Sequence, residues 1–230
     1  MSALHSLSLY PLVSLSSSMN FELLIPNQEL KLDNVQLRMP GPHQADNAAV
    51  ALATIAELRH QGWCISNEAM RQGLSQAMLP GRVEILPGEP TVVLDTAHNP
   101  ASARALVQTL AELPAIERRT LIVSISSDKD VPAVVRELAG HFDRIIVTQY
   151  QDNARAVPVE ELAEVVRAEL GSSSTEVLVC QTPREAWRKA TTTAKPRALV
   201  CISGSFFLAA ELRPLVLAAH AADTTAPVSR

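Results

Sequence analysis

The fold is decided by residues 91–110, which read TVVLDTAHNP followed by ASARALVQTL. The first four residues are apolar or β-branched and predict a short buried strand. Pro100 begins a predicted helix, because proline is well tolerated in the first helical turn. The polar run from Asp95 to Asn99 lies between the two. This segment therefore predicts a strand that leads through a polar turn into a helix.

The same alternation continues toward the end of the chain. Strands are predicted at residues 120–125, 144–147, 176–179 and 198–202, and helices at residues 100–113, 131–140, 158–170 and 183–191. Continuous apolar strands that alternate with helices are typical of a mostly parallel sheet with helices on both faces. The sequence therefore predicts an α/β fold, in which ligands collect at the carboxyl ends of the strands.

The first third of the chain has a different pattern. Alternating apolar and polar residues predict a hairpin over residues 20–38, with Pro26-Asn27 at its turn. Helical spacing begins near Asp46, and a second helix is predicted from Ser66 to Ala77.

A domain boundary is expected near Pro80, where the helical pattern ends. We predict that residues 1–79 are the C-terminal piece of one domain and that residues 80–230 form a complete, Rossmann-like α/β domain. Hydrophobic residues make up 47% of the sequence and aromatic residues only 3%, so the core must be aliphatic.

Composition and charge argue against several classes of function. The formal net charge is -4 with both signs interspersed, so no basic face for nucleic acid is expected. No apolar run is long enough for a membrane helix, and residues 1–19 contain no Lys or Arg, which a secretory signal requires. We interpret Cys64, Cys180 and Cys201 as reduced core residues of a cytoplasmic protein.

The polar turn after residues 91–94 is the first candidate site. Asp95, His98 and Asn99 place a carboxylate, an imidazole and an amide at the end of a strand and beside a helix N-terminus. Backbone N–H groups and the helix dipole favour phosphate there, and an aspartate can accept hydrogen bonds from ribose hydroxyls. The residues are equally compatible with Asp95 and Asn99 as simple helix caps.

Other polar segments are expected near the same cleft. His43, Gln44 and Asn47 open a helix with more hydrogen-bonding side chains than one cap needs. Arg82 lies at the expected domain junction, where it either reaches a nucleotide or forms an interdomain salt bridge. Three further polar turns follow predicted strands and are either plain turns or parts of the cleft: Ser126–Asp130, Asn153–Ala156 and Gly204-Ser205.

Taken in order, these segments resemble the folylpolyglutamate synthase/dihydrofolate synthase family of the Mur ligase superfamily. The matching motifs are His43-Gln44-x-x-Asn47, Pro80-Gly81-Arg82-x-Glu84, Leu94-Asp95-x-Ala97-His98-Asn99-Pro100, Ser127-Asp128-Lys129-Asp130, Asn153-x-Arg155-Ala156 and Gly204-Ser205. Each motif alone could occur by chance, but the ordered set at family-like spacing is specific.

The resemblance implies an ATP-dependent amide ligase that acts as a monomer. ATP would phosphorylate a carboxylate of dihydropteroate or of a folate, and the amine of L-glutamate would attack the acyl phosphate to give an amide, ADP and phosphate. Such an enzyme must neutralise phosphate charge, align its reactants and exclude water. Mg²⁺ is implied as well. Whether the product is dihydrofolate or a polyglutamate is left open.

The resemblance also implies roles for single residues. Asn47 and His43 would contact the nucleotide, Asn47 on its adenine side, and Arg82 would reach the phosphates or the ribose from the hinge. Asp95 would engage the ribose region, and Asp95 and His98 would be the catalytic residues. His98 would stabilise charge or position groups near the γ-phosphate and the incoming glutamate. Weaker candidates on the glutamate or interdomain side are Asp128, Arg155 and Ser205.

The sequence departs from the family pattern as well. It contains no G-x-x-x-x-G-K-[ST] loop, no G-x-G-x-x-G after a strand and no Cys/His cluster with metal-ligand spacing. In the family the phosphate loop and the metal ligands lie upstream of the matching region, and glycine is usual where Thr96 stands. We therefore expect these 230 residues alone to be unable to ligate.

Three other interpretations of the sequence are open. A peptidoglycan-type Mur ligase would share Asn47, Arg82 and Asp95, but the segments around His98 and Asp128 favour the folate branch. A non-catalytic remnant domain would explain the missing phosphate loop directly. A dinucleotide-binding domain lacks the glycine fingerprint that it needs.

Overall fold

The computed structural model describes residues 18–25, 28–113, 116–151, 153–194 and 197–225, so the expected turn at Pro26-Asn27 and the segment 1–17 lie outside it. The elements occur in this order: β1 (Ser18–Ile25), β2 (Gln28–Gln36), α1 (His43–His60), α2 (Asn67–Gln76), β3 (Glu84–Leu86), β4 (Thr91–Leu94), α3 (Pro100–Ala111), β5 (Arg118–Val123), α4 (Val131–Ala139), β6 (Arg144–Val147), α5 (Val159–Leu170), β7 (Glu176–Val179), α6 (Pro183–Thr192), β8 (Ala198–Ser203) and α7 (Phe206–Thr225).

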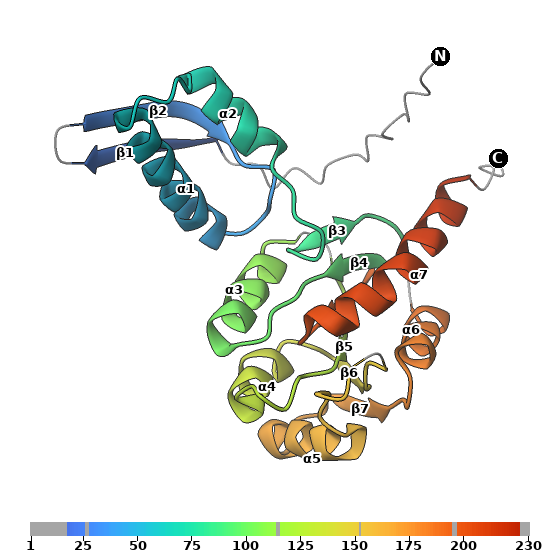
Figure 1. Ribbon diagram of the computed structural model, residues 1–230. Coiled ribbons are helices and arrows are strands. Elements are labelled where there is room, and N and C mark those ends of the chain that lie inside the picture. The colour runs from blue at the N-terminus through green and yellow to red at the C-terminus, as the bar shows by residue number, and fades with distance from the viewer. Residues whose placement is uncertain (1–17, 26–27, 114–115, 152, 195–196, 226–230) are drawn as a thin grey trace.

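A six-stranded sheet with the order β3-β4-β8-β5-β6-β7 forms the larger part of the molecule (Figure 1). The pairs β4–β8, β8–β5, β5–β6 and β6–β7 are parallel, and β3 alone runs antiparallel to its neighbour β4. The prediction of a mostly parallel α/β sheet is confirmed. The sequence did not predict β3, because three residues are too few to show a periodic pattern.

The register aligns the carboxyl ends of the central strands. Leu94 of β4 pairs with Ile202 of β8, whose last residue, Ser203, pairs with Val123 of β5. Val123 in turn pairs with Val147 of β6. The residues that follow these four strands therefore lie along one edge of the sheet, where ligands bind in this class of fold.

Helices cover both faces of this sheet, as the sequence predicted. Figure 1 shows α3, α4 and α5 on one side of the sheet and α6 and α7 on the other. Apolar side chains from α3 to α5 join one buried cluster with the sheet, and those from α6 and α7 join a second cluster on the opposite face. Burial on both faces explains why the strands carry continuous apolar runs.

The hairpin β1–β2 and the helices α1 and α2 form a smaller unit with a core of its own (Figure 1). That core consists of Leu30, Leu32, Val35, Leu52, Ala56 and Met70. It shares no buried residue with the two clusters around the large sheet. The domain boundary near Pro80 remains a prediction that this separation supports.

Most predicted elements match the structure closely. Strands β4, β6 and β7 have the predicted bounds, and Ser66 caps α2 as expected, since its side chain accepts a hydrogen bond from the Ala69 N–H. Helix α1 begins at His43, three residues before the expected start, because Pro42 already has a helical backbone. Among the described helices, none is long and apolar enough to cross a membrane.

Candidate functional site

Asp95 is the first residue after β4 and is buried, with 6% of its surface exposed. One carboxylate oxygen, Oδ1, accepts a hydrogen bond of 2.7 Å from the Ala97 N–H. The other, Oδ2, accepts one of 2.9 Å from the Val83 N–H. Burial raises the pKa of Asp95, while these hydrogen bonds and the charge of Arg82 oppose the increase. Asp95 thus joins the turn after β4 to the turn before β3.

The helix cap of α3 is Asn99, not Asp95. The Asn99 side chain accepts a hydrogen bond from the Ser102 N–H at 2.9 Å, and Ser102 Oγ accepts one from the Asn99 N–H at 3.2 Å. This is a reciprocal capping box. The capping interpretation is therefore confirmed for Asn99, whereas both oxygens of Asp95 are engaged elsewhere.

His98 lies in the same turn and is half-buried. Its Nδ1 is 2.9 Å from the backbone oxygen of Thr96. Because a carbonyl oxygen only accepts hydrogen bonds, Nδ1 carries the proton of the neutral ring. Nε2 is then the nitrogen that can take up or release a proton.

Arg82 and His98 both pack against one aromatic ring, that of Phe206. The guanidinium carbon of Arg82 lies 5.2 Å from the centre of the Phe206 ring, and the His98 ring lies 5.3 Å from it. Phe206 is the first residue of α7 and is 48% exposed. The structure thus brings together Arg82, Asp95 and His98, which the sequence singled out separately.

A second arginine lies over the next ring along the chain. The guanidinium carbon of Arg155 is 5.3 Å from the centre of the Phe207 ring. Tyr150 packs on the same ring with 5.2 Å between the ring centres, and its hydroxyl is 2.7 Å from Ser126 Oγ. Ser205 Oγ accepts a hydrogen bond of 3.1 Å from the Phe207 N–H. The start of α7 therefore carries a guanidinium over each of two adjacent phenylalanines.

The turn after β5 contains one residue that caps a helix and one charged residue that is exposed. Asp130 caps α4 by accepting a hydrogen bond of 3.2 Å from the Ala133 N–H, as the plain-turn interpretation predicts. Asp128 pairs with Lys129 at 3.0 Å, and this pairing lowers the pKa of Asp128. Asp128 is exposed at the same edge of the sheet.

His43, Gln44 and Asn47 form a hydrogen-bonded set at the start of α1. The Gln44 amide lies 3.0 Å from His43 Nε2, and the Asn47 amide donates to Gln44 Oε1 at 3.1 Å. In the parts of the chain that the structure describes, no hydrogen bond or ion pair joins this set to the residues around Phe206. A coulombic interaction nevertheless links His43 to the Asp95 carboxylate, so the set lies near the Arg82–His98 cluster without a direct bond to it.

Sequence reasoning missed the aromatic residues of the site. Phe206, Phe207 and Tyr150 belong to a sequence with 3% aromatic residues, and two of them directly follow Gly204-Ser205. The scarcity of aromatic residues, and the position of Phe206 and Phe207 directly after Gly204-Ser205, could have identified them from the sequence. Their arginine partners come from distant segments, so the pairing itself could not be predicted.

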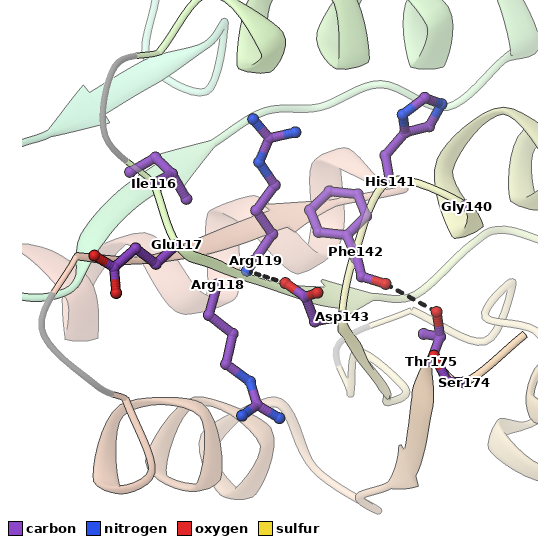
Figure 2. Close-up of a pocket in the computed structure, with 10 residues that line it drawn as sticks. All are labelled: Ile116, Glu117, Arg118, Arg119, Gly140, His141, Phe142, Asp143, Ser174 and Thr175. Atoms are coloured by element: carbon purple, nitrogen blue, oxygen red, sulfur yellow. Dashed lines mark hydrogen bonds between the residues drawn. The ribbon is translucent and has the colours of Figure 1, made fainter.

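A hollow of about 740 Å³ lies at the opposite, amino-terminal edge of the sheet (Figure 2). Arg118 and Arg119 point away from each other in Figure 2, as adjacent residues of a strand do. The Arg119 N–H donates to Asp143 at 2.7 Å, and Thr175 Oγ1 donates to the Phe142 oxygen at 3.0 Å. These polar groups serve the packing of loops and do not converge on one point.

The described residues hold no group of three or more His, Cys, Asp and Glu side chains that could bind a metal ion. Among the described residues, the candidate site consists of arginine, histidine, the Asp95 carboxylate, and hydroxyl and backbone N–H groups.

Comparisons with known proteins identify relatives of this chain. The family described as "Mur ligase, glutamate ligase domain" matches residues 81–206. A dihydrofolate synthase/folylpolyglutamate synthase of Mycobacterium tuberculosis is 38% identical over 132 residues, which are 56% of this chain and 27% of the relative.

Two solved structures extend the similarity. A folylpolyglutamate synthase of Mycobacterium tuberculosis complexed with ADP and AMPPCP has a TM-score of 0.73 at 34% identity, over 80% of this chain and 42% of that one. A bifunctional folylpolyglutamate synthase/dihydrofolate synthase with Mn, AMPPNP and L-glutamate bound has a TM-score of 0.67 at 31% identity, over 81% and 42%. The chain thus spans less than half the length of these relatives.

Proposed function

The chain belongs to the Mur ligase family, whose glutamate ligase domain it carries, and we propose that it is the C-terminal part of an ATP-dependent folylpolyglutamate/dihydrofolate synthase. The enzyme would join L-glutamate to an activated carboxylate of dihydropteroate or of a folate. Residues 1–79 would be the end of the central nucleotide-binding domain, and residues 80–230 the C-terminal ligase domain.

The observation that carries this proposal is the meeting of Arg82 and His98 over Phe206 at the carboxyl edge of the sheet. A guanidinium and an imidazole stand there beside the N-terminus of α7, whose N–H groups and dipole favour anions. Two of the three substrates of the proposed reaction are a nucleotide and an amino acid with two carboxylates, and both of these are anionic. The chemistry of this edge suits both.

Nucleotide contacts are proposed for Arg82, Asn47 and His43. The atoms Thr96 Oγ1 and His43 Nδ1 are buried and have no hydrogen-bond partner among the described residues. Atoms without exposed surface cannot contact a ligand directly, so a nucleotide would meet the exposed Asn47 and other, accessible atoms of Arg82 and His43. Bound ATP would supply the phosphoryl group that activates the carboxylate, and Arg82 would neutralise part of its charge.

Asp95 would mainly hold neighbouring segments of the site in place. The resemblance implies a contact with the ribose region, but both carboxylate oxygens already accept backbone hydrogen bonds. Asp95 would therefore hold the turn that carries Arg82, and a ribose hydroxyl would share an oxygen that is already engaged.

Glutamate contacts are proposed on the side of Phe207. Arg155 would pair with a carboxylate of L-glutamate, and Ser205 would add a hydroxyl, with Asp128 as a more distant charge. His98 would position or stabilise charge between the two substrates through Nε2, because Nδ1 is held by Thr96. Mg²⁺ would have its ligands outside the described residues, so no step is assigned to it.

Ligand titration of the isotopically labelled chain, followed by NMR, tests this proposal. AMPPCP should shift the signals of Arg82 and Asn47 in a saturable way, and L-glutamate should then shift those of Arg155. The Arg119 signals, at the opposite edge, are the internal control and should stay unchanged.

Three outcomes decide between the candidate functions. Saturable shifts at the carboxyl edge with L-glutamate, and weaker ones with D-glutamate, support the folate branch. Equal or stronger shifts with an amino acid other than L-glutamate would favour a peptidoglycan-type ligase. Absence of saturable shifts with every nucleotide and amino acid would leave the non-catalytic domain as the better description.

A further inference from the structure

The turn from Pro80 to Glu84, which carries Arg82, has an unusual backbone. Gly81 has φ 69° and Val83 has φ 46°, on either side of Arg82. Glycine adopts positive φ readily, but a β-branched valine does so at a cost. Such a conformation persists only where the surrounding structure holds it in place.

Two carboxylates hold this turn by its backbone. Asp95 accepts the Val83 N–H at 2.9 Å, and Glu84 Oε2 accepts the Gly81 N–H at 3.0 Å. The two amides on either side of Arg82 are therefore both fixed. The direction in which the Arg82 side chain leaves the backbone follows from these two hydrogen bonds.

Glu84 is itself held by Arg213 of α7. The Arg213 Nε donates to Glu84 Oε2 at 2.9 Å, and its Nη2 donates to Glu84 Oε1 at 2.8 Å. The Glu84 side chain is 8% exposed and that of Arg213 33%. A bidentate pair fixes the orientation of the carboxylate plane, and partial burial protects it from solvent screening.

Helix α7 thus contacts the turn at two points. Phe206 lies below the Arg82 guanidinium at 5.2 Å, and Arg213 grips Glu84. The two residues are two helical turns apart and so lie on the same face of α7. The same helix begins directly after Gly204-Ser205, on the proposed glutamate side.

We propose that Arg213 is a positioning residue: through Glu84 it fixes the Gly81 amide, and so holds Arg82 over Phe206 in the direction that nucleotide binding requires. The use of Arg82 for a nucleotide rests on the function proposed above, whereas the placement of Arg82 by Arg213 does not. Arg213 would act through Glu84, which it contacts, and not through a substrate. It links the turn that carries Arg82 to the helix that begins at Ser205.

The test compares three variants of the full chain. Arg213→Met removes the bidentate pair and keeps the aliphatic stem, and Arg213→Lys keeps the charge but not the fork. The matched control is Arg104→Met, which removes another bidentate pair, with Glu137, on an exposed helix surface away from the turn.

The first readout is the Nε–Hε NMR signal of Arg82, assigned by its loss in Arg82→Lys. The Phe206 ring shifts this signal through its ring current. In Arg213→Met the signal should move toward the position of a free arginine, in Arg213→Lys it should move part of the way, and in Arg104→Met it should stay. An unchanged Arg82 signal in folded Arg213→Met overturns the inference. If Arg213→Met does not fold, an unchanged Arg82 signal in Arg213→Lys overturns the inference.

The second readout is affinity for AMPPCP, which separates this inference from the proposed function. We expect Arg213→Met to bind about tenfold more weakly than the unaltered chain, as loss of one well-aligned charged contact would. Equal affinity in Arg213→Met, together with weaker binding in Arg82→Lys, contradicts the positioning role. If the unaltered chain does not bind, the proposed function fails, while the Arg82 signal still decides whether Arg213 places Arg82.

Discussion

At the scale of single residues, two side chains show how this edge of the sheet is built. Asp95 is buried, yet both of its oxygens accept backbone N–H groups from two different turns. Gly204, between β8 and α7, has φ 101° and lies so close to β5 that a side chain would not fit. Asp95 joins two turns by hydrogen bonds, and Gly204 lets the turn before α7 lie close to the end of β5.

The ionisation of Asp95 should depend on burial. Burial raises the pKa above its ordinary value of 3.8, against the backbone donors and Arg82. The contribution of Asp95 to the free energy of unfolding is therefore fully present below pH 3.8, and it is lost as pH rises through the raised pKa. A ¹³C NMR titration of the Asp95 carboxyl should show a midpoint above 3.8.

Glu137 provides the opposite case within the same molecule. Its hydrogen bond with Arg104 lowers the pKa of Glu137 below 4.5. The contribution of Glu137 to the stability of the fold is therefore present above that pH and is lost as pH falls.

For Asp95, a titration midpoint at or below 3.8 would show that its hydrogen bonds outweigh burial.

Gly204 should not tolerate a methyl group. A Cβ there would lie 2.6 Å from the Ser124 oxygen. We expect Gly204→Ala to lower the free energy of unfolding by about 3 kcal/mol, from backbone strain and steric overlap. Gly140 has φ -70° and open space around it, so Gly140→Ala should change stability by less than about 1 kcal/mol. Urea unfolding of both variants checks this, and equal losses would contradict the close approach at Gly204.

At the scale of elements, the sequence predicted the strands and helices of the large sheet because their signals are local. After their first residue, strands β4, β6 and β7 are uninterrupted apolar runs, and α3 has proline at its start. The polar residues after β4 were correctly placed at the carboxyl edge of the sheet. Arg82 and Phe206, or Glu84 and Arg213, lie far apart in the sequence, and no periodic pattern predicts such a contact.

The capping box of α3 should contribute to stability independently of any ligand. Asn99 is exposed, so Asn99→Ala loses the hydrogen bond with the Ser102 N–H but little packing. We expect a loss of about 1 kcal/mol in the free energy of unfolding. Asn99→Asp keeps an acceptor at this position and is the control, which should stay close to the unaltered chain. A similar loss in both variants would mean that the side-chain acceptor is not the source of the effect.

At the scale of the whole molecule, the site is a set of contacts between segments around the start of α7. Arg82 comes from the turn before β3, His98 from the turn after β4 and Arg155 from the turn after β6. These groups can bind and orient anions. The sequence contains no G-x-x-x-x-G-K-[ST] loop for a triphosphate, so under the proposed function they would supply only part of what phosphoryl transfer requires.

The purified 230-residue chain should therefore not ligate by itself. With ATP, Mg²⁺, L-glutamate and dihydropteroate or a folate, ADP release should not exceed that of the chain without the folate substrate. Chromatography of the folate products gives an independent measurement. Formation of an elongated folate by the purified chain would contradict this expectation and would require a phosphate site of another kind.

Photo-crosslinking with an azido-ATP analogue, followed by mass spectrometry of the labelled peptides, tests the central claim most directly. The account predicts labelled peptides that contain Asn47, Arg82 or His98, with labelling reduced by excess ATP and by Arg82→Lys. Labelling confined to the opposite edge, around Arg118 and His141, or labelling that excess ATP does not reduce, would contradict the claim that the carboxyl edge of this sheet binds a nucleotide.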